Sequence, residues 1–516
     1  MRQVFRKIPV YTGDVSGVCS ALFELGGMVV MHDPSGCNST YNTHDEIRWY
    51  DHDSLIFLSG LDEMDAIMGS DDRLIHDIAE AARIYSPEFI AVANSPIPYI
   101  TGMDFEAVCR AVEQVTGIPS FYISTNGMHD YVHGAGLALL RVAERFTAPG
   151  RPETEQAPGL SASAEFMKSM KLMKPHRITC NLLGVTPLDF ANPSNLPSLY
   201  SKFSEAGADI LSCWAMACRP GNEDKCNVEE DNLNSGEDNP LREEVRLNIW
   251  EDDQLRNEDS RPVDGNLEAT VNSRHSLLEQ ISVSSQADVN ILLSSVGFPA
   301  AEYMYKKYGI PFVAGIPARG VEKLFFEAVR RAVQTGQSQY PFRQRTEITG
   351  CRMSAEMGFA ETSAEKKEES VYCFIGEPVI MSSLAAQTAA LTGSRTYVFG
   401  ATEGAAAFLG DTDSPLGGEE EIQAALEHLM ENGCALKVVA DPCYGDVLPE
   451  GCSLIRLPHL AFSGRIFLDE IPDLMSVDIA GPGAETRKYS DTTNVIPGNE
   501  GLSVETRKIR TDCIDK

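Results

Sequence analysis

Residues 301–314 read AEYMYKKYGIPFVA, and this stretch contains the pattern that decides the fold. A helical stretch with an apolar face runs up to Gly309, and an apolar strand begins at Phe312. Glycine is common just after a helix because it adopts left-handed backbone angles without a steric penalty. The stretch therefore predicts a helix, a sharp turn at Gly309 and a strand that is buried on both faces.

The same order of helix, glycine and strand occurs twice more, far from the first example. Gly117 precedes a strand expected at 121–123, and Gly393 precedes a strand expected at 396–399. Strands this short and apolar are typical of parallel sheets that helices cover on both faces. Three such units spread over 516 residues predict an α/β protein of three Rossmann-like domains, each a parallel sheet flanked by helices.

Composition shifts place the boundaries between these domains. Segments rich in proline, glycine and polar residues predict linkers. Within the second domain, residues 219–268 are acidic and rich in asparagine, which indicates a solvated insertion with little core of its own. The predicted limits are 1–148 for the first domain, 149–174 for a linker, 175–337 for the second domain, 338–369 for a second linker, 370–476 for the third domain and 477–516 for a C-terminal tail.

Composition also restricts the class of protein. The formal net charge is -32, so we expect neither nucleic acid nor an anionic membrane as a partner. The 13 cysteines are odd in number and lack the spacing of a disulfide framework, which favours a reducing compartment. The N-terminus has no apolar signal segment, and no stretch reaches the length of a membrane-spanning helix. We therefore expect a cytoplasmic protein without a membrane partner.

Two cysteines near the N-terminus are the first candidates for chemistry. Cys19 follows Gly17, and Cys37 follows Gly36, so we expect both thiols on loops that a second subunit can approach. Two thiolates are half of the ligand set of a cubane iron–sulfur cluster, and a two-fold dimer would supply the other half. The alternative is that both are buried packing residues, which is the common role of single cysteines.

Further motifs follow these cysteines along the chain. In order, they are Cys19, Pro34-Ser35-Gly36-Cys37, Asp65 to Ser70, Ser95-Pro96-Ile97-Pro98, Gly102-Met103-Asp104, Tyr308-Gly309-Ile310-Pro311, Asp441-Pro442 and Pro458 to Arg465. Together they resemble the nitrogenase component 1 superfamily, which includes the molybdenum–iron protein subunits, cofactor-assembly scaffolds and tetrapyrrole reductases. The resemblance spans most of the chain.

The resemblance implies an iron–sulfur cluster at a subunit interface, held by cysteines of the first domain. Carried over to this chain, the ligands are Cys19 and Cys37, while Ser95 stands in place of the family's usual third cysteine. Because a hydroxyl is a poor iron ligand, we expect a [4Fe-4S] cluster shared across a dimer rather than a larger cluster. The partner is either a second copy or a related subunit. The alternative role for Ser95 is to cap the turn before Pro96.

The large cofactor site of true nitrogenases is incomplete in this chain. An ungapped count back from Gly309 places Leu293 where the family has a cofactor-binding cysteine. His459 lies near the place of the family's cofactor histidine, but its spacing to Ser463 and Gly464 is one residue short of that pattern. The alternative for His459 is a hydrogen-bonded structural role. The resemblance therefore implies an oxidoreductase other than a dinitrogen reductase.

The resemblance also implies a route for electrons. A separate ATP-dependent iron–sulfur reductase would pass electrons to the cluster, and a substrate bound between the domains would be reduced. The alternatives are a non-catalytic scaffold for metallocluster assembly and a structural partner subunit of the same fold. The chain has no Walker motif and no dinucleotide-binding fingerprint, so we do not expect it to bind a nucleotide itself.

One further pair of residues has the spacing of metal ligands. His129 and His133 are four residues apart, which would place two imidazoles on one face of a helix. No carboxylate or cysteine stands at a matching spacing, and Gly127, Gly134 and Gly136 are expected to disturb that helix. The sequence therefore does not favour a metal site at these histidines.

Overall fold

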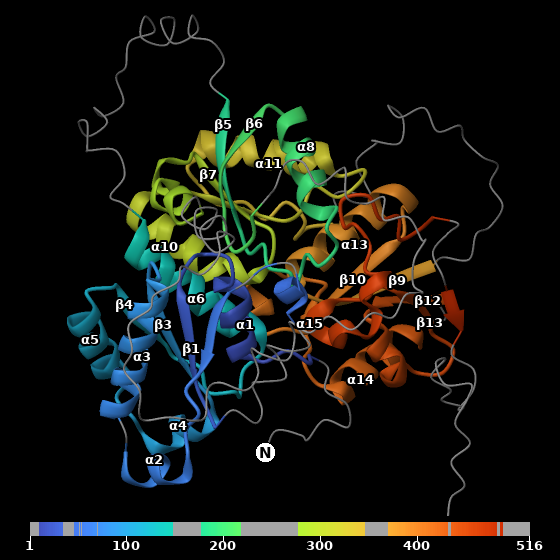
Figure 1. Ribbon diagram of the computed structural model, residues 1–516. Coiled ribbons are helices and arrows are strands. Elements are labelled where there is room, and N and C mark those ends of the chain that lie inside the picture. The colour runs from blue at the N-terminus through green and yellow to red at the C-terminus, as the bar shows by residue number, and fades with distance from the viewer. Residues whose placement is uncertain are drawn as a thin grey trace, which may run out of the picture.

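The computed structural model describes residues 10–34, 46–50, 52, 54–69, 71–147, 177–217, 277–345, 370–431, 435–481 and 486–488. Within these residues the chain forms three sheets, one in each third of the sequence (Figure 1). The predicted α/β fold of three domains with parallel sheets is confirmed. The acidic insertion 219–268, the linker 149–174 and Cys37 lie outside the described residues.

The first domain is a four-stranded parallel sheet in the order β2-β1-β3-β4. Its strands are β1 (Met28–His32), β2 (Leu55–Leu58), β3 (Ile90–Asn94) and β4 (Ser120–Ile123). Its helices are α1 (Asp14–Leu22), α2 (Glu63–Met68), α3 (Asp71–Tyr85), α4 (Pro96–Thr101), α5 (Phe105–Thr116) and α6 (Tyr131–Phe146), with a short 3-10 helix η2 (Ile47–Tyr50). Alternate strand residues face opposite sides, so Met28 and Val30 pack with α3 and α5, whereas Val29 and Met31 pack with α1 and α6.

The second domain is also a four-stranded parallel sheet, in the order β6-β5-β7-β8. Its strands are β5 (Ile178–Leu183), β6 (Ala208–Cys213), β7 (Val289–Leu292) and β8 (Phe312–Ala314). Its helices are α8 (Asn195–Glu205), α10 (Phe298–Tyr308) and α11 (Glu322–Thr335), with 3-10 helices η5 (Ser284–Gln286) and η6 (Ser295–Gly297). The strand β7 is buried throughout, as expected for a strand covered on both faces.

The third domain has six strands in the order β11-β10-β9-β12-β13-β14. They are β9 (Ser370–Gly376), β10 (Arg395–Gly400), β11 (Ser414–Pro415), β12 (Ala435–Ala440), β13 (Ser453–Arg456) and β14 (Thr486–Lys488). The helices are α13 (Pro378–Thr392), α14 (Glu419–Met430) and α15 (Leu460–Ser463), with 3-10 helices η8 (Ala405–Ala407), η9 (Pro442–Val447) and η10 (Gly464–Glu470). All pairs are parallel except β13 with β14, which is antiparallel and comes from the predicted tail.

The three glycines that predicted the fold all end helices. Gly117, Gly309 and Gly393 follow α5, α10 and α13 with φ angles of 72°, 71° and 73°. Each donates its backbone N–H to a carbonyl of the last helical turn, which satisfies a group that the helix end leaves unpaired. The left-handed caps expected from the sequence are therefore confirmed.

Other glycines serve helix packing rather than turns. Gly134 and Gly136 lie inside α6, which is a continuous helix, so the expectation that they disturb it is wrong. A Cβ at Gly134 would lie 1.9 Å from the Asp14 carbonyl oxygen, and one at Gly17 would lie 2.3 Å from the Tyr131 carbonyl oxygen. Only residues without a side chain allow α1 and α6 to approach so closely.

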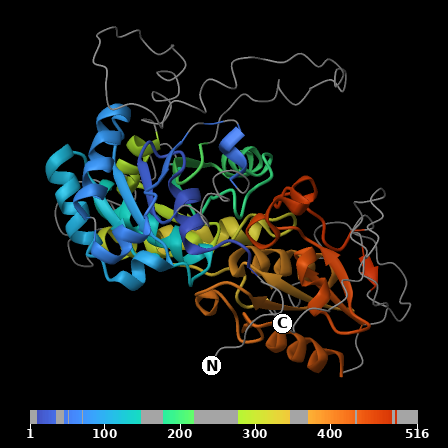
Figure 2. The ribbon, with the colours of Figure 1, turned by 60° about the horizontal axis from the view of Figure 1, so that its bottom comes forward.

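The three domains meet where the carboxyl ends of their strands converge. Figure 2 shows the first domain in blue and the third in orange to red on opposite sides, with yellow helices of the second domain between them. The N-terminal segment joins the outer two, because the Thr12 N–H donates to the Ala461 carbonyl at 3.0 Å and Thr12 accepts from Tyr131 at 3.0 Å. Parallel α/β sheets bind ligands at this end of their strands.

Candidate functional site

Cys19 lies inside α1 rather than on the expected loop. Its side chain is fully buried in the core of the first domain, and the nearby Gly17 provides the close contact with α6 instead of a turn. Burial, together with the negative charge of Glu46, raises the pKa of the Cys19 thiol far above its usual range. The free thiol is thus protonated, whereas a bound metal ion would remove its proton.

A buried arginine packs beside this cysteine. Arg48 donates to both carboxylate oxygens of Glu46, at 2.8 and 2.9 Å, and to the Ser20 carbonyl at 2.8 Å. It also contacts Glu24 at 3.0 Å, so one guanidinium neutralises two partly or fully buried carboxylates. The contacts of Arg48 with Ser20 and Glu24 hold η2 against α1, and the bidentate pair with Glu46 fixes the orientation of the guanidinium.

Ser95 occupies the N-cap position of α4, and Pro96 follows at the first helical position. Its side chain makes no capping hydrogen bond, and the hydroxyl is buried without a hydrogen-bond partner. The Ser95 N–H donates to the carbonyl of His32, the last residue of β1, at 3.3 Å. Ser95 therefore directly follows β3 and lies beside the end of β1, the strand after which the chain continues to Cys37. An unpartnered buried hydroxyl is costly, which is consistent with a position that faces a missing group.

An exposed apolar surface lies next to Ser95. The short helices α2 and α4 contact each other at the edge of the first domain (Figure 1). We call their exposed apolar residues the α2–α4 patch: Met64, Ile67, Met68, Ile97, Tyr99 and Ile100, of which Ile67 and Ile100 are each 76% exposed. Contiguous exposed apolar side chains usually mark a surface that another molecule covers.

A buried polar group lies where the three domains meet. The Tyr131 hydroxyl, from α6, donates to Asp189 Oδ1 at 2.5 Å, and His459 Nε2 lies 3.3 Å from the same oxygen. Glu377, directly after β9, is also fully buried and interacts electrostatically with Asp189. We call Tyr131, Asp189, Glu377 and His459 the inner polar cluster. It draws residues from all three domains.

Glu377 has a perturbed acidity. Burial, and then the nearby Asp189 charge, raise its pKa to about 7. Its oxygens accept from the backbone N–H groups of Ser295 and Ile380, both at 2.8 Å, so the side chain also caps α13 and links the second and third domains. A carboxyl group with this pKa exists in both protonation states near neutral pH.

His459 is placed by an aspartate of its own domain. Its backbone N–H donates to Asp441 Oδ2 at 2.9 Å, and Ser463 donates to the same oxygen at 2.8 Å. Neither imidazole nitrogen is aligned for a hydrogen bond, and the second oxygen of Asp189 also has none. These buried polar atoms can therefore form hydrogen bonds with a bound ligand.

The sequence located some of these residues and missed others. His459 was a candidate and lies in the inner polar cluster, whereas Cys19 and Ser95 lie in the first domain. Tyr131, Asp189 and Glu377 were not candidates. The one sequence signal for Glu377 is its position directly after an apolar strand, where parallel sheets place ligand-binding residues.

These features agree with a comparison of the sequence with known families. A sequence model described as nitrogenase component 1 type oxidoreductase matches residues 16–350, which is more than half of the chain. The chain belongs to the nitrogenase component 1 type oxidoreductase family.

Curated relatives within this family match over short segments. The chain is 32% identical over 103 residues to the nitrogenase iron-molybdenum cofactor biosynthesis protein NifE of Klebsiella pneumoniae, covering 19% of this chain and 22% of NifE. It is 26% identical over 165 residues to component CfbD of the Ni-sirohydrochlorin a,c-diamide reductive cyclase complex of Methanothermobacter thermautotrophicus, covering 30% of this chain and 43% of CfbD. The matches thus span less than half of each relative.

A solved structure aligns along most of this chain. The structure titled "Nitrogenase Cp1 at pH 6.5" aligns with 92% of this chain and 94% of its own, at 14% identity and a TM-score of 0.49. In the part of this chain that the structure describes, we find no helix long and apolar enough to cross a membrane.

The donor atoms of the first domain fit an iron–sulfur cluster in kind. The Cys19 sulfur is the kind of soft ligand that binds iron in iron–sulfur clusters. The Ser95 hydroxyl is buried without a hydrogen-bond partner at the carboxyl end of the sheet, from which the chain continues to Cys37. Cys37 itself lies outside the described residues.

Proposed function

We propose that this chain is the substrate-reducing component of a two-component cytoplasmic oxidoreductase. A separate ATP-dependent iron–sulfur reductase supplies electrons, and a [4Fe-4S] cluster held by Cys19 and Cys37 of two subunits receives them. A substrate bound between the three domains is reduced. Membership of the nitrogenase component 1 family supports the reaction class. The observation that carries the proposal is the inner polar cluster, in which a buried carboxyl group, Glu377, meets Asp189 from the second domain.

The residues of the inner polar cluster have distinct roles in this proposal. Reduction of an unsaturated substrate consumes protons together with electrons, so buried acids must stand beside the substrate. Burial and the nearby Asp189 raise the pKa of Glu377 to about 7, so it can release and take up a proton near neutral pH. Asp189 accepts from Tyr131, and its Oδ1 lies 3.3 Å from His459 Nε2. Glu377 is therefore the proposed proton donor, and His459 the proposed polar contact to the substrate.

The cluster would supply electron transfer when bound. For this chain, the proposal requires that Cys19 and Cys37 reach the same iron–sulfur core, with the buried Arg48 and Glu46 beside it. The α2–α4 patch, next to Ser95, is the surface that the second subunit would cover. We assign that subunit to a second copy of this chain, since two symmetry-related copies would contribute equal sets of thiols to one cluster.

The cluster assignment is tested by anaerobic purification and iron analysis. We expect a brown protein with about four iron and four sulfide ions per dimer. Cys19→Ser and Cys37→Ser should each bleach it. Cys109→Ser is the matched control, because Cys109 is a buried cysteine on α5 of the same domain. A colourless wild-type protein after anaerobic reconstitution, or bleaching by the control, would refute the assignment.

The dimer assignment is tested at the α2–α4 patch. Ile100→Asp places a charge on the exposed surface of α4, so it should convert the dimer to a monomer in light scattering while circular dichroism shows that the chain remains folded. Ile84→Asp is the control, since Ile84 is 60% exposed on α3. If the wild-type chain alone is a monomer that dimerises with a related subunit, that subunit rather than a second copy covers the α2–α4 patch. If Ile100→Asp leaves assembly unchanged, the patch is not the interface.

A second candidate function is a scaffold on which a metallocluster is built and then transferred. The similarity to NifE, a cofactor biosynthesis protein, favours it. The two functions differ in what happens to bound metal during turnover. With the reductase and ATP, an enzyme oxidises its reduced cluster when substrate is added and keeps its iron, and Glu377→Gln slows this reaction. A scaffold loses iron to an acceptor protein, and Glu377→Gln has no effect on the transfer.

A further inference from the structure

Two histidines and a glutamate from different domains meet at the start of α6. His129 directly precedes the helix cap Asp130, His133 lies in the first turn of α6, and Glu403 follows β10 of the third domain. His129 Nδ1 lies 2.9 Å from Glu403 Oε2, and His133 Nδ1 lies 3.8 Å from a carboxylate oxygen of the same residue. The two imidazole rings are stacked with centroids 4.0 Å apart. We call His129, His133 and Glu403 the outer polar cluster.

We propose that the outer polar cluster binds a divalent transition-metal ion, with its three side chains as the protein ligands. One donor atom from each residue lies within 4.8 Å of the other two. Around a tetrahedral ion with ligand bonds of about 2.1 Å, neighbouring donors are about 3.4 Å apart. The observed separations lie on both sides of this value, so small rotations of the side chains would close the site around an ion.

The donor set selects the class of ion. Two imidazoles and one carboxylate are a ligand set of zinc sites that keep an open position, and of ferrous sites with open positions. Magnesium and calcium prefer oxygen ligands, so this site disfavours them. Three protein ligands leave at least one coordination position for water or another small ligand. The site is therefore of the kind that exchanges ligands, rather than a closed structural site.

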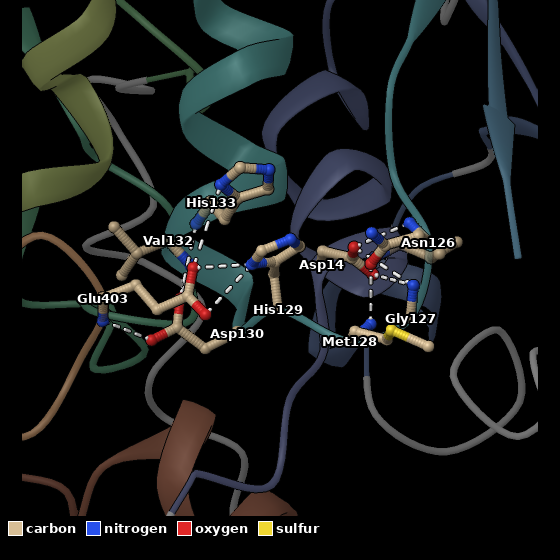
Figure 3. Close-up of polar contacts among 10 residues, drawn as sticks. Asp14, Asn126, Gly127, Met128, His129, Asp130, Val132, His133 and Glu403 are labelled. Atoms are coloured by element: carbon tan, nitrogen blue, oxygen red, sulfur yellow. Dashed lines mark hydrogen bonds and ion pairs between the residues drawn. The ribbon is translucent and has the colours of Figure 1, made fainter. Parts of the chain in front are cut away.

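Two carboxylates hold the backbone that carries these ligands. Asp130 accepts a hydrogen bond from the Glu403 N–H at 2.7 Å, which fixes the third-domain loop against α6. Asp14 accepts from the Gly127 N–H at 3.0 Å, in the loop that leads to His129 (Figure 3). Groups that orient metal ligands in this way support metal affinity. The first and third domains thus already hold the three ligands close together, so ion binding requires no large domain movement.

The cluster is reachable from solvent. The side chains of His129, His133 and Glu403 are 35%, 33% and 39% exposed, so an ion can arrive without opening the core. In Figure 3 both rings turn a nitrogen toward the carboxylate, whereas a simple ion pair needs only one.

The test is titration of the chelator-treated, full-length protein with Zn²⁺ and, separately, with Co²⁺. Because the chain contains other metal-binding side chains, including 13 cysteines, the measured quantity is the difference between wild type and variants. We expect Glu403→Gln and His133→Ala each to lose one equivalent of Zn²⁺, with affinity at that site reduced at least about 100-fold. In these two variants, the Co²⁺-loaded protein should lose the visible absorption band that this site gives in wild type. Because the site has no sulfur ligand, that band should be separate from any sulfur-to-metal charge-transfer absorption.

Controls separate this site from other histidines and from unfolding. His76→Ala removes a more exposed imidazole beside an acidic residue, Glu80, and should leave the binding curve unchanged. Asp130→Asn keeps all three ligands and should weaken the site about 10- to 100-fold. Zn²⁺ should raise the melting temperature of wild type more than that of Glu403→Gln. Equal binding by wild type and Glu403→Gln, with both folded by circular dichroism, would overturn the proposal, as would equal affinity for Mg²⁺ and Zn²⁺.

The native ion is identified by metal analysis of protein purified anaerobically without added metal. Zinc or iron that is present in wild type and missing from Glu403→Gln supports the assignment and names the ion. If neither metal differs between them while the titrations also agree, the site does not bind metal. The measurement does not depend on the [4Fe-4S] cluster, because Cys19→Ser should abolish the cluster signal and leave the outer polar cluster intact.

Discussion

The inner and outer polar clusters use the same kinds of side chain and differ in burial. Glu377 and Asp189 are fully buried in the inner cluster, whereas Glu403 of the outer cluster is 39% exposed. One helix start serves both, since Tyr131 points inward and His129 lies two residues before it. Side chains only two residues apart, Tyr131 and His129, therefore contact carboxylates in two different environments.

The difference in burial determines what each cluster is suited to hold. Burying a charge in the core costs free energy, so burial raises the pKa of the Glu377 carboxyl group to about 7. At the edge, water screens the carboxylate and lets a cation reach it. We infer that the inner cluster carries protons and the outer cluster carries a metal ion. Matched substitutions in the two clusters test this comparison.

The largest contrast is expected between Glu377→Ala and Glu403→Ala. At about pH 6, below the Glu377 pKa, Glu377→Ala should lower the free energy of unfolding by about 3–5 kcal/mol, because it removes a helix cap and leaves two buried N–H groups unpaired. Glu403→Ala should cost less than about 1 kcal/mol in metal-free protein, since the side chains of its ion pair with His129 are 35% and 39% exposed. Urea unfolding of both variants measures the difference, and similar costs would show that burial does not separate the clusters.

The pH dependence of stability should show the same contrast. The folded pKa of Glu377 is raised from 4.5 to about 7, so the folded protein binds more protons than the unfolded chain between these values. The free energy of unfolding should therefore fall by roughly 2–3 kcal/mol as pH rises through this window. Glu377→Gln should reduce this slope, whereas Glu403→Gln should not. An unchanged slope in Glu377→Gln would assign the pH dependence to other groups.

The sequence predicted the fold because its signals were local. Gly117, Gly309 and Gly393 each end a helix and precede a buried strand, and both features depend on a few neighbouring residues. The position of Cys19 was wrong because Gly17 has a non-local role. Its missing side chain admits the backbone of α6, which begins over 100 residues later, and no neighbouring residue indicates that contact.

The site was less predictable for the same physical reason. His129 and His133 had metal-ligand spacing, but their third partner, Glu403, is 274 residues from His129 and belongs to another domain. Asp189 and Tyr131 likewise meet only in the folded chain. Single residues at the ends of parallel strands, such as Glu377, could be identified from the sequence, but their pairing depends on how three domains pack.

A smaller effect is expected for Tyr131→Phe in the inner cluster. The substitution keeps the ring in the core and removes the hydroxyl that donates to Asp189 at 2.5 Å. Asp189 then loses its one short hydrogen bond, so the free energy of unfolding should fall by about 1–3 kcal/mol at neutral pH. Tyr303→Phe is the control, because that hydroxyl is bonded to the exposed Lys307. Equal costs at the two tyrosines would argue against a buried network.

The smallest effect is expected for His129→Gln in metal-free protein. The His129 imidazole is 35% exposed and pairs with Glu403 near the surface, so its loss should cost only a few tenths of a kcal/mol at neutral pH. This cost should shrink further at high salt, because screening weakens exposed pairs, while the cost of Tyr131→Phe should not change with salt. Urea unfolding at low and high ionic strength, in the presence of a chelator, distinguishes the two. Adding Zn²⁺ should then enlarge the His129→Gln difference, since only wild type retains the full ligand set. A large, salt-independent cost without metal would instead show that His129 anchors the domain contact by packing, and the outer cluster would no longer differ from the inner one in the way that we infer.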